Sequence, residues 1–87
     1  MTAIATGQVS IGSSGAAQIV AARAGRTQLR LFGLGSLLGN HVLIGHDATV
    51  TALSGYFEAG MLVLATDGAV WGVSSNGTLV VSFLEAY

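Results

Sequence analysis

The chain has almost no charge, and this scarcity restricts what the protein can be. Its 87 residues include no lysine, cysteine or proline, and only three arginines and four acids, whereas 52% of them are hydrophobic. Without cysteine, the chain has no disulfide framework, no thiolate metal site and no cysteine nucleophile. A net charge of −1 provides no strong field for nucleic acid or an anionic membrane. We therefore expect neither of these partners.

The few charges are unevenly distributed along the chain. The cations form one group: Arg23, Arg26 and Arg30. The acids all follow later in the sequence: Asp47, Glu58, Asp67 and Glu85. Two interpretations are open, an accidental distribution or arginines that meet the acids of a neighbouring copy or another partner.

Much of the apolar content must lie at the surface. A domain of this length buries only roughly 60–65% of the surface of its unfolded chain, and exposed apolar patches usually mark partner surfaces. We therefore expect the protein to act as one copy among many. No run of about 18 apolar residues is present, which predicts no membrane span. Residues 3–22 are uncharged, but no Lys or Arg precedes them and polar side chains interrupt them, so we expect no signal peptide.

Glycine punctuates the sequence and favours an all-β fold. The 13 glycines separate short segments rich in Val, Ile, Leu and Thr, a pattern typical of short strands with tight turns. No long segment carries the 3.6-residue apolar repeat of a helix. We predict a small antiparallel β-sandwich or barrel-like jelly roll of about eight short strands. The expected strands cover residues 8–11, 17–22, 27–34, 41–45, 48–51, 61–66, 69–73 and 78–86.

Two segments suggest more detailed organisation. Asp67-Gly68 and Asn76-Gly77 have the residue types of tight hairpin turns, which predicts a three-stranded meander in the C-terminal half. Residues 1–7 are uncharged and lack a strong turn signal, so we expect an extended arm before a single domain at 8–87. Such an arm would be ordered by adding a strand to an exposed sheet edge of a partner.

Strand alternation predicts which apolar side chains face outward. With Val42 and Ile44 facing inward, Leu43 would face outward. Residues 61–64 are apolar on both faces, and so is most of 80–84, as in strands that are covered on both sides. We therefore predict that Leu43, Met61 and Val63 lie beneath a neighbouring subunit.

Three aromatic residues are candidates for the centre of an interface. Tyr56, Phe57 and Trp71 are of the type that is enriched there. Aromatic side chains also stack on sugars, and simple core packing is the ordinary alternative, above all for Trp71.

No motif in the sequence predicts catalysis. His41, His46 and Asp47 form the one cluster that resembles a metal site, but the two histidines have opposite strand parity and a fourth ligand is missing nearby. We expect turn or surface roles for them, with a metal shared across a symmetry axis as the alternative. Residues 33–39 lack the Lys-Ser/Thr ending of a phosphate-binding loop. We therefore expect no enzyme, no cofactor and no small-molecule substrate.

Several short segments, taken in order, resemble a known family. They lie at 26–31, 41–51, 55–60, 62–64, 68–73, 75–78 and 81–85. Their order and spacing are similar to those in small β-sandwich structural proteins of tailed bacteriophages, found as capsid decoration or head-fibre modules. The loop at 56–58 lacks a proline that is common in the family, and Met61 and Val63 replace polar or acidic residues.

The resemblance implies a structural role on the outside of the virion. The expected partners are the major capsid protein and other copies of the chain, in a closed homo-oligomer for which we favour a trimer, then a dimer. The chain would be made in the host bacterial cytoplasm, and the arm could also dock on the capsid shell. The expected interface residues are Leu43, Tyr56, Phe57, Met61, Val63, Trp71, Arg23, Arg26 and Arg30. The alternatives are a receptor- or glycan-binding module of a virion appendage and a self-assembling domain with no viral link.

Overall fold

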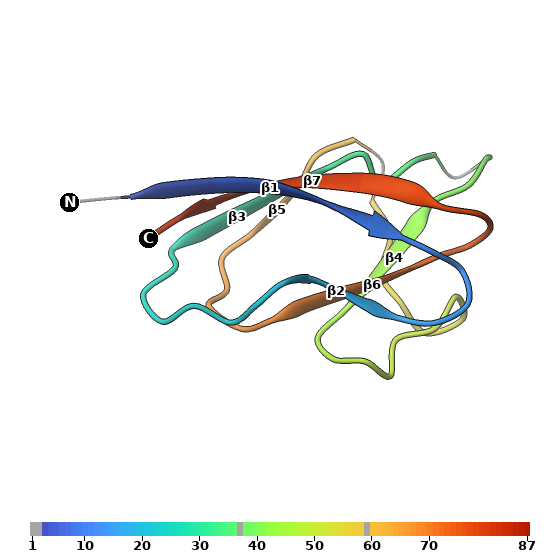
Figure 1. Cartoon of the computed structure of the whole chain (residues 1–87), viewed down its shortest axis with the longest axis horizontal. Coiled ribbons are helices and arrows are strands. Elements are labelled where there is room, and N and C mark those ends of the chain that lie inside the picture. The colour runs from blue at the N-terminus through green and yellow to red at the C-terminus, as the bar shows by residue number, and fades with distance from the viewer. Residues whose placement is uncertain (1–2, 37, 59) are drawn as a thin grey trace.

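The chain folds as two stacked antiparallel sheets. The computed structural model describes residues 3–36, 38–58 and 60–87, and within these it has seven strands and no helix. The strands are β1 (Ile4–Ile11), β2 (Ala17–Val20), β3 (Gln28–Phe32), β4 (Val42–Gly45), β5 (Leu62–Leu64), β6 (Val70–Ser74) and β7 (Leu79–Ala86). The larger sheet has the order β1-β7-β3-β5 and the smaller sheet the order β2-β6-β4 (Figure 1). The all-β sandwich expected from the sequence is confirmed.

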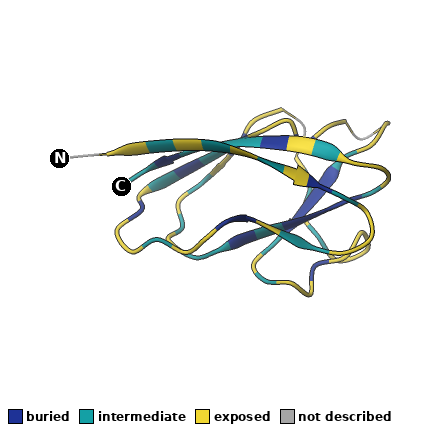
Figure 2. Ribbon diagram, viewed as in Figure 1, coloured by how far each residue is buried: buried dark blue, intermediate teal, exposed yellow. Residues whose placement is uncertain are grey.

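The core lies between the two layers (Figure 2). The larger sheet contributes Ile11, Leu29, Leu31 and Val81, each with no exposed surface, and the smaller sheet contributes Val42, which is also fully buried. Burying an aliphatic side chain of this size contributes about 1.5–3 kcal/mol. Alternating strand residues supply these side chains, as Leu29 and Leu31 do in β3.

Consecutive strands never pair with each other. The odd-numbered strands form the larger sheet and the even-numbered strands the smaller one, so every connection between the described strands crosses the sandwich. The predicted C-terminal meander is therefore wrong. Asp67-Gly68 and Asn76-Gly77 do lie between strands, where the chain bends at Gly68 and at Asn76-Gly77, and Gly77 has a positive φ of 66°. These turns lead the chain from one layer to the other and do not close hairpins.

The first strand starts earlier than the sequence analysis expects. Residues 4–7, assigned to an extended arm at 1–7, are the first half of β1 and pair with β7 from Ile4↔Ala86 to Gly7↔Phe83. The backbone N–H and C=O groups of an apolar segment can be hydrogen-bonded when the segment adds to a sheet edge. Here that edge belongs to the same chain. The expected boundary between residues 7 and 8 thus falls inside a regular strand. Residues 1 and 2 of the expected arm lie outside the described part of the chain.

The strand expected at residues 48–51 is a turn. The Asp47 carboxylate accepts hydrogen bonds from the backbone N–H and the hydroxyl of Thr49, which bends the chain instead of extending it. The other strands agree with the expected positions to within a few residues at each end, and the observed number is seven.

Candidate interaction surface

The side of the larger sheet that faces away from the core is a broad surface, which we call the outer face. It carries the alternate residues of each strand, matched across the sheet by register. One row runs Thr6, Leu84, Arg30, Val63 from β1 to β5. The neighbouring row begins Gln8, Ser82, Phe32, and the antiparallel register of β3 with β5 extends it toward Met61.

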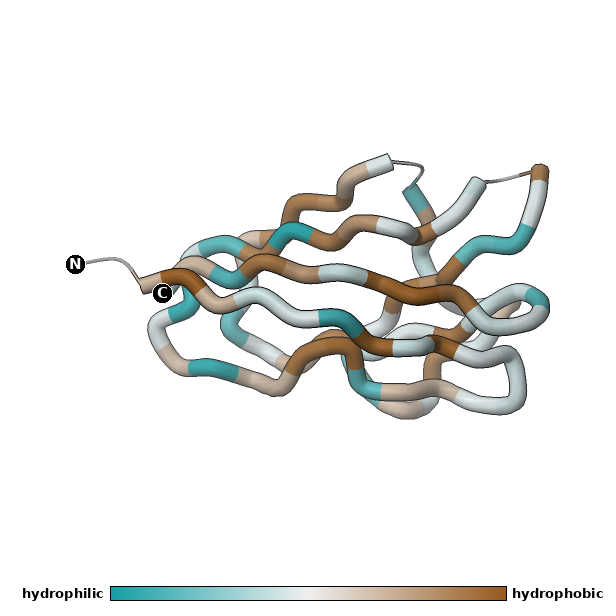
Figure 3. The backbone as a smooth tube through the Cα atoms, turned by 45° about the horizontal axis from the view of Figure 1, so that its top comes forward, coloured by the Kyte–Doolittle hydropathy of each residue, from teal (hydrophilic) through white to brown (hydrophobic). Residues whose placement is uncertain are grey.

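The outer face exposes large apolar side chains. Their exposed fractions are Ile4 66%, Phe32 42%, Met61 42%, Val63 46% and Val80 52%. Figure 3 shows that hydrophobic residues recur along the strands of the sandwich. The only charged residue on this face within the described strands is Arg30. An apolar sheet face with so little charge is typical of a surface that another protein covers.

Arg30 lies in the middle of this face, between Leu84 of β7 and Val63 of β5. Its Nε atom is buried and has no hydrogen-bond partner among the described residues. A buried donor without a partner costs about 1–3 kcal/mol. The residue as a whole is only partly buried, so Arg30 remains an expected interface residue.

A shallow hollow opens on the same face. It is bordered by Thr6 and Gln8 of β1, Phe32 of β3, and Ser82 and Leu84 of β7. The small Ser82 side chain, which accepts a hydrogen bond from Gln8 Nε2 at 3.3 Å, forms part of its lining. The outer face is therefore not flat, and a protruding side chain of a partner could enter it.

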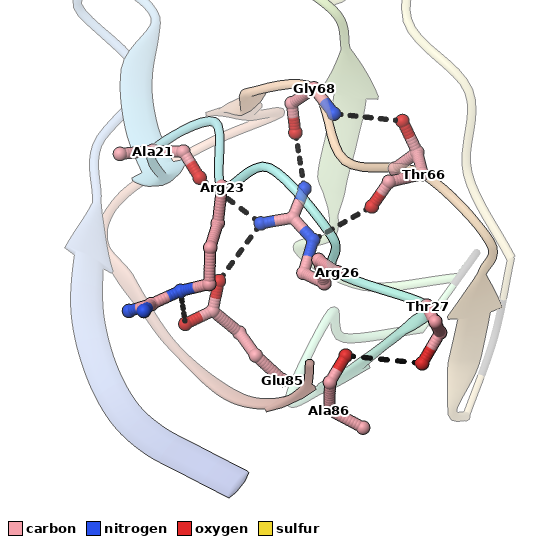
Figure 4. A network of polar contacts seen from close by, with 8 residues as sticks. All are labelled: Ala21, Arg23, Arg26, Thr27, Thr66, Gly68, Glu85 and Ala86. Carbon is pink, nitrogen blue, oxygen red and sulfur yellow. Dashed lines mark hydrogen bonds and ion pairs between the residues drawn. The ribbon is translucent and has the colours of Figure 1, made fainter. Parts of the chain in front are cut away.

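Arg26 is a structural residue inside the chain, not an exposed interface residue. It is 4% exposed and pairs with the equally buried Glu85, with 2.9 Å between Nη1 and Oε1 (Figure 4). Its guanidinium also donates to three backbone carbonyls, those of Ala21, Thr66 and Gly68. The planar fork of arginine thus ties the loop before β3 to the loop after β5 and to β7.

Arg23 joins the same cluster from its exposed side. Its Nε lies 3.4 Å from Glu85 Oε2, and its guanidinium carbon is 3.9 Å from the centre of the Tyr87 ring. The prediction that the arginines meet acids of another copy is therefore wrong for Arg26, which is buried against an acid of its own chain. Arg23 contacts the same acid, which lies between the two arginines (Figure 4).

Leu43 does face away from the sandwich, as predicted, but its own chain covers it. It is 7% exposed and packs with Val50 and Val73, and Trp71 and Ala16 border this second, smaller core. The loop at 46–55 passes so close that no side chain would fit at Gly55, where a Cβ would overlap Leu43. Leu43 is thus not available to a partner. Trp71 is half-buried in this packing, which was the alternative to an interface role for it.

The aromatic loop offers one exposed ring. Tyr56 is exposed, and its hydroxyl donates to Glu58 Oε1 at 3.1 Å. This hydrogen bond, together with the negative charge of Glu58, raises the pKa of Tyr56. Phe57 instead packs against the core, with its ring centre 4.7 Å from that of His41. Of the two neighbours, only Tyr56 presents a large free surface.

His41, His46 and Asp47 do not come together. His46 Nε2 lies 3.2 Å from Asp47 Oδ2 on the loop after β4, whereas His41 Nδ1 lies 3.1 Å from the carbonyl oxygen of Gly39. No group of three or more His, Cys, Asp or Glu in the described ranges is arranged to hold a metal. The hydrogen bonds from Thr49 lower the pKa of Asp47, side chain first and backbone second, as expected for a turn carboxylate.

No protein-family model, curated protein or solved structure matches the chain. Among the residues that the structure describes, no helix is long and apolar enough to cross a membrane. The site is therefore defined by geometry alone. The sequence analysis named Met61, Val63 and Arg30, and it included Val80 in a segment that is apolar on both faces. It did not name Phe32 and Ile4, whose alternation with inward residues was the available signal.

Proposed function

We propose that the chain is a non-catalytic structural protein of a tailed-phage virion, which forms a closed homo-oligomer and decorates or stabilises the capsid. The outer face is the contact surface in this proposal. It would pack against the major capsid protein, with Phe32, Met61 and Val63 as its apolar centre.

The exposed, nearly uncharged outer face is the observation that carries the proposal. Its apolar residues come from all strands of the larger sheet and lie in adjacent rows, so they form one surface and not scattered exceptions. Each apolar Å² removed from water contributes about 25 cal/mol before the cost of association is subtracted. Repetition over a symmetric lattice turns a modest contact into strong overall binding. The resemblance of the order of its segments to that in phage decoration proteins supports the same function.

A binding experiment on empty heads tests the proposal. Heads assembled from the major capsid protein of the same genome would be mixed with the purified chain and sedimented, and electron microscopy would locate added density on the head. We expect saturable binding at symmetry-related positions on the outer surface. Absence of binding at tens of micromolar chain, with the protein folded, would overturn the capsid role.

One specific observation favours a second function, glycan binding by a virion appendage. Tyr56 presents an exposed ring beside a carboxylate, with its hydroxyl on Glu58, and sugars bind to such combinations of an aromatic face and a hydrogen-bonding acid. A glycan array would test this function. Binding that is lost in Tyr56→Ala and kept in Met61→Glu would support it, whereas an array without signal would reject it.

A further inference from the structure

The free edge of β1 is an unprotected sheet edge. β1 spans Ile4–Ile11 and pairs with β7 along its whole length without a register shift, and no strand described by the structure pairs with its other side. Natural sheets protect long edges with charge, proline, bulges or very short strands. The segment IATGQVSI has no charge, no proline and no bulge.

The other edges of the sandwich do carry protection. β5 is only three residues long, and β2 is short and has an irregular register between Gln18 and Val20. β4 is covered in part, because Ile44 and Tyr56 exchange two backbone hydrogen bonds. β1 is thus the long edge that is left open among the described strands.

The hydrogen-bond parity of β1 shows which groups face that edge. Ala3 and Tyr87 exchange two backbone hydrogen bonds, so the odd residues of β1 continue this ladder toward β7. The hydrogen bond from the Thr27 N–H to the Ala86 carbonyl agrees with this parity. It shows that the even residues of β7 direct their backbone groups toward β3 and not toward β1. Ile4, Thr6, Gln8 and Ser10 therefore point their N–H and C=O groups to the open edge, while their side chains lie on the outer face.

We propose that this edge pairs with the same edge of a second copy, antiparallel and around a twofold axis at Gly7. In that register Ile4 lies opposite the partner's Ser10, and Thr6 lies opposite the partner's Gln8. All four residues whose backbone groups face the open edge then form hydrogen-bonded pairs, for about eight backbone hydrogen bonds. A registry shifted by two residues would leave one of the four without a partner in β1.

A second copy fits this edge better than a charged partner segment. Self-pairing places each side chain of β1 beside another side chain of β1, and none of these is charged, so no like charges meet. The twofold contact also closes on itself, whereas pairing of β1 with a different edge would continue into a filament. The result is one continuous eight-stranded sheet across two copies.

The pairing also has a consequence for the proposed function, and only this consequence rests on that function. A twofold axis perpendicular to the sheet places both outer faces on the same side, so the apolar surface doubles. Two such faces on one particle would bind a repeating lattice with avidity that a single face lacks.

Lysine substitutions at the edge test the pairing. Thr6→Lys with Gln8→Lys brings four lysines together at the twofold axis, and the matched control Ala52→Lys with Leu53→Lys adds the same charge to the exposed loop after β4. We expect light scattering to show a dimer for the wild type and the control and a monomer for T6K/Q8K, with strand content retained by circular dichroism. Mixing T6K/Q8K with T6E/Q8E should restore a one-to-one dimer. A wild-type monomer at 1 mM, a trimer, or an unchanged T6K/Q8K assembly would overturn the proposal.

Amide exchange supplies a second readout that depends on parity. Raising the wild-type concentration from about 20 µM to about 1 mM should slow exchange severalfold at Thr6 and Gln8, whose N–H groups face the edge. Ala5 and Val9, already bonded to β7, should change little. Slowing without this alternation would contradict edge pairing. A dimer that fails to bind heads would reject the capsid role alone, and a monomer that binds heads would reject the pairing alone.

Discussion

Arg26 and Glu85 form a buried ion pair that joins two residues far apart in the sequence, with 2.9 Å between Nη1 and Oε1. Neither charge would be tolerated alone in the interior, because desolvation of an unpaired ion is costly. The Nε, Nη1 and Nη2 atoms of Arg26 each also donate to a backbone carbonyl. The pair therefore fixes the position of the loops at one end of the sandwich.

Replacing Arg26 should destabilise the fold strongly. Arg26→Ala leaves Glu85 buried without its partner and three carbonyls without their donor, so we expect the free energy of unfolding in urea to fall by about 3–5 kcal/mol. Arg23→Ala is the matched control, since it removes a half-exposed cation from the same carboxylate, and it should cost about 1 kcal/mol or less. Equal losses for the two variants would contradict the special role of the buried partner.

A side chain at Gly7 should disturb the packing of Phe83. A Cβ at this position would lie 2.6 Å from the Cζ atom of the Phe83 ring, so the ring must move. We expect Gly7→Ala to lower the free energy of unfolding by about 1–3 kcal/mol, as overpacking does. Combining it with Phe83→Leu should cost less than the sum of the single variants in a double-mutant cycle. Strict additivity would show that the ring does not fill this space.

Acidic residues on the outer face should weaken binding to heads. Met61→Glu with Val63→Glu places two charges in the apolar surface, and we expect at least tenfold weaker sedimentation with heads while the β1 pairing persists. Ala52→Glu with Leu53→Glu, on the exposed loop at 46–55, is the control for added charge and should bind as the wild type does. Dissociation of the oligomer by M61E/V63E would instead support the sequence prediction that a neighbouring subunit covers these residues.

The ionisation of Tyr56 should depend on Glu58. The hydrogen bond to Glu58 and its charge raise the pKa of Tyr56 above the ordinary 10.0. The hydrogen bond to Glu58 therefore persists below pH 10.0 and is lost as the pH rises through the raised pKa of Tyr56. In a Tyr87→Phe background, where Tyr56 is the one tyrosine left, ultraviolet titration should show a lower pKa after Glu58→Ala. An unchanged titration curve would mean that the two side chains do not interact in solution.

Local alternation predicted much of the fold. Leu29 and Leu31 are fully buried, and Leu62 is buried beside an exposed Val63, because strand periodicity decides which side each residue faces. The same rule placed Leu43 on the outside of its sheet, and it does lie there. Strand alternation could not predict that the loop at 46–55 folds back over Leu43, where Val50 packs against it.

The rest of the site depends on contacts between distant parts of the chain. Nothing near Arg26 indicates that its partner is Glu85, and the two glycine turns carry no information on which sheet the next strand joins. The segment at 4–7 was predicted to add to a sheet edge of a partner, but it pairs with β7 of its own chain. Which distant residues and strands contact each other depends on the whole fold and not on any local sequence pattern.

The alternation of strands between layers has a consequence for how the chain folds. Since no two consecutive strands of the described residues pair, local pairing among these residues is limited to the isolated bridges Gly35↔His41 and Ile44↔Tyr56. Every ladder between two strands must close a long loop first. We expect refolding on the slow time scale of all-β domains, milliseconds to seconds. On the ribosome, β1 must wait for the last strand of the chain, so both of its edges stay open until synthesis has passed Ala86.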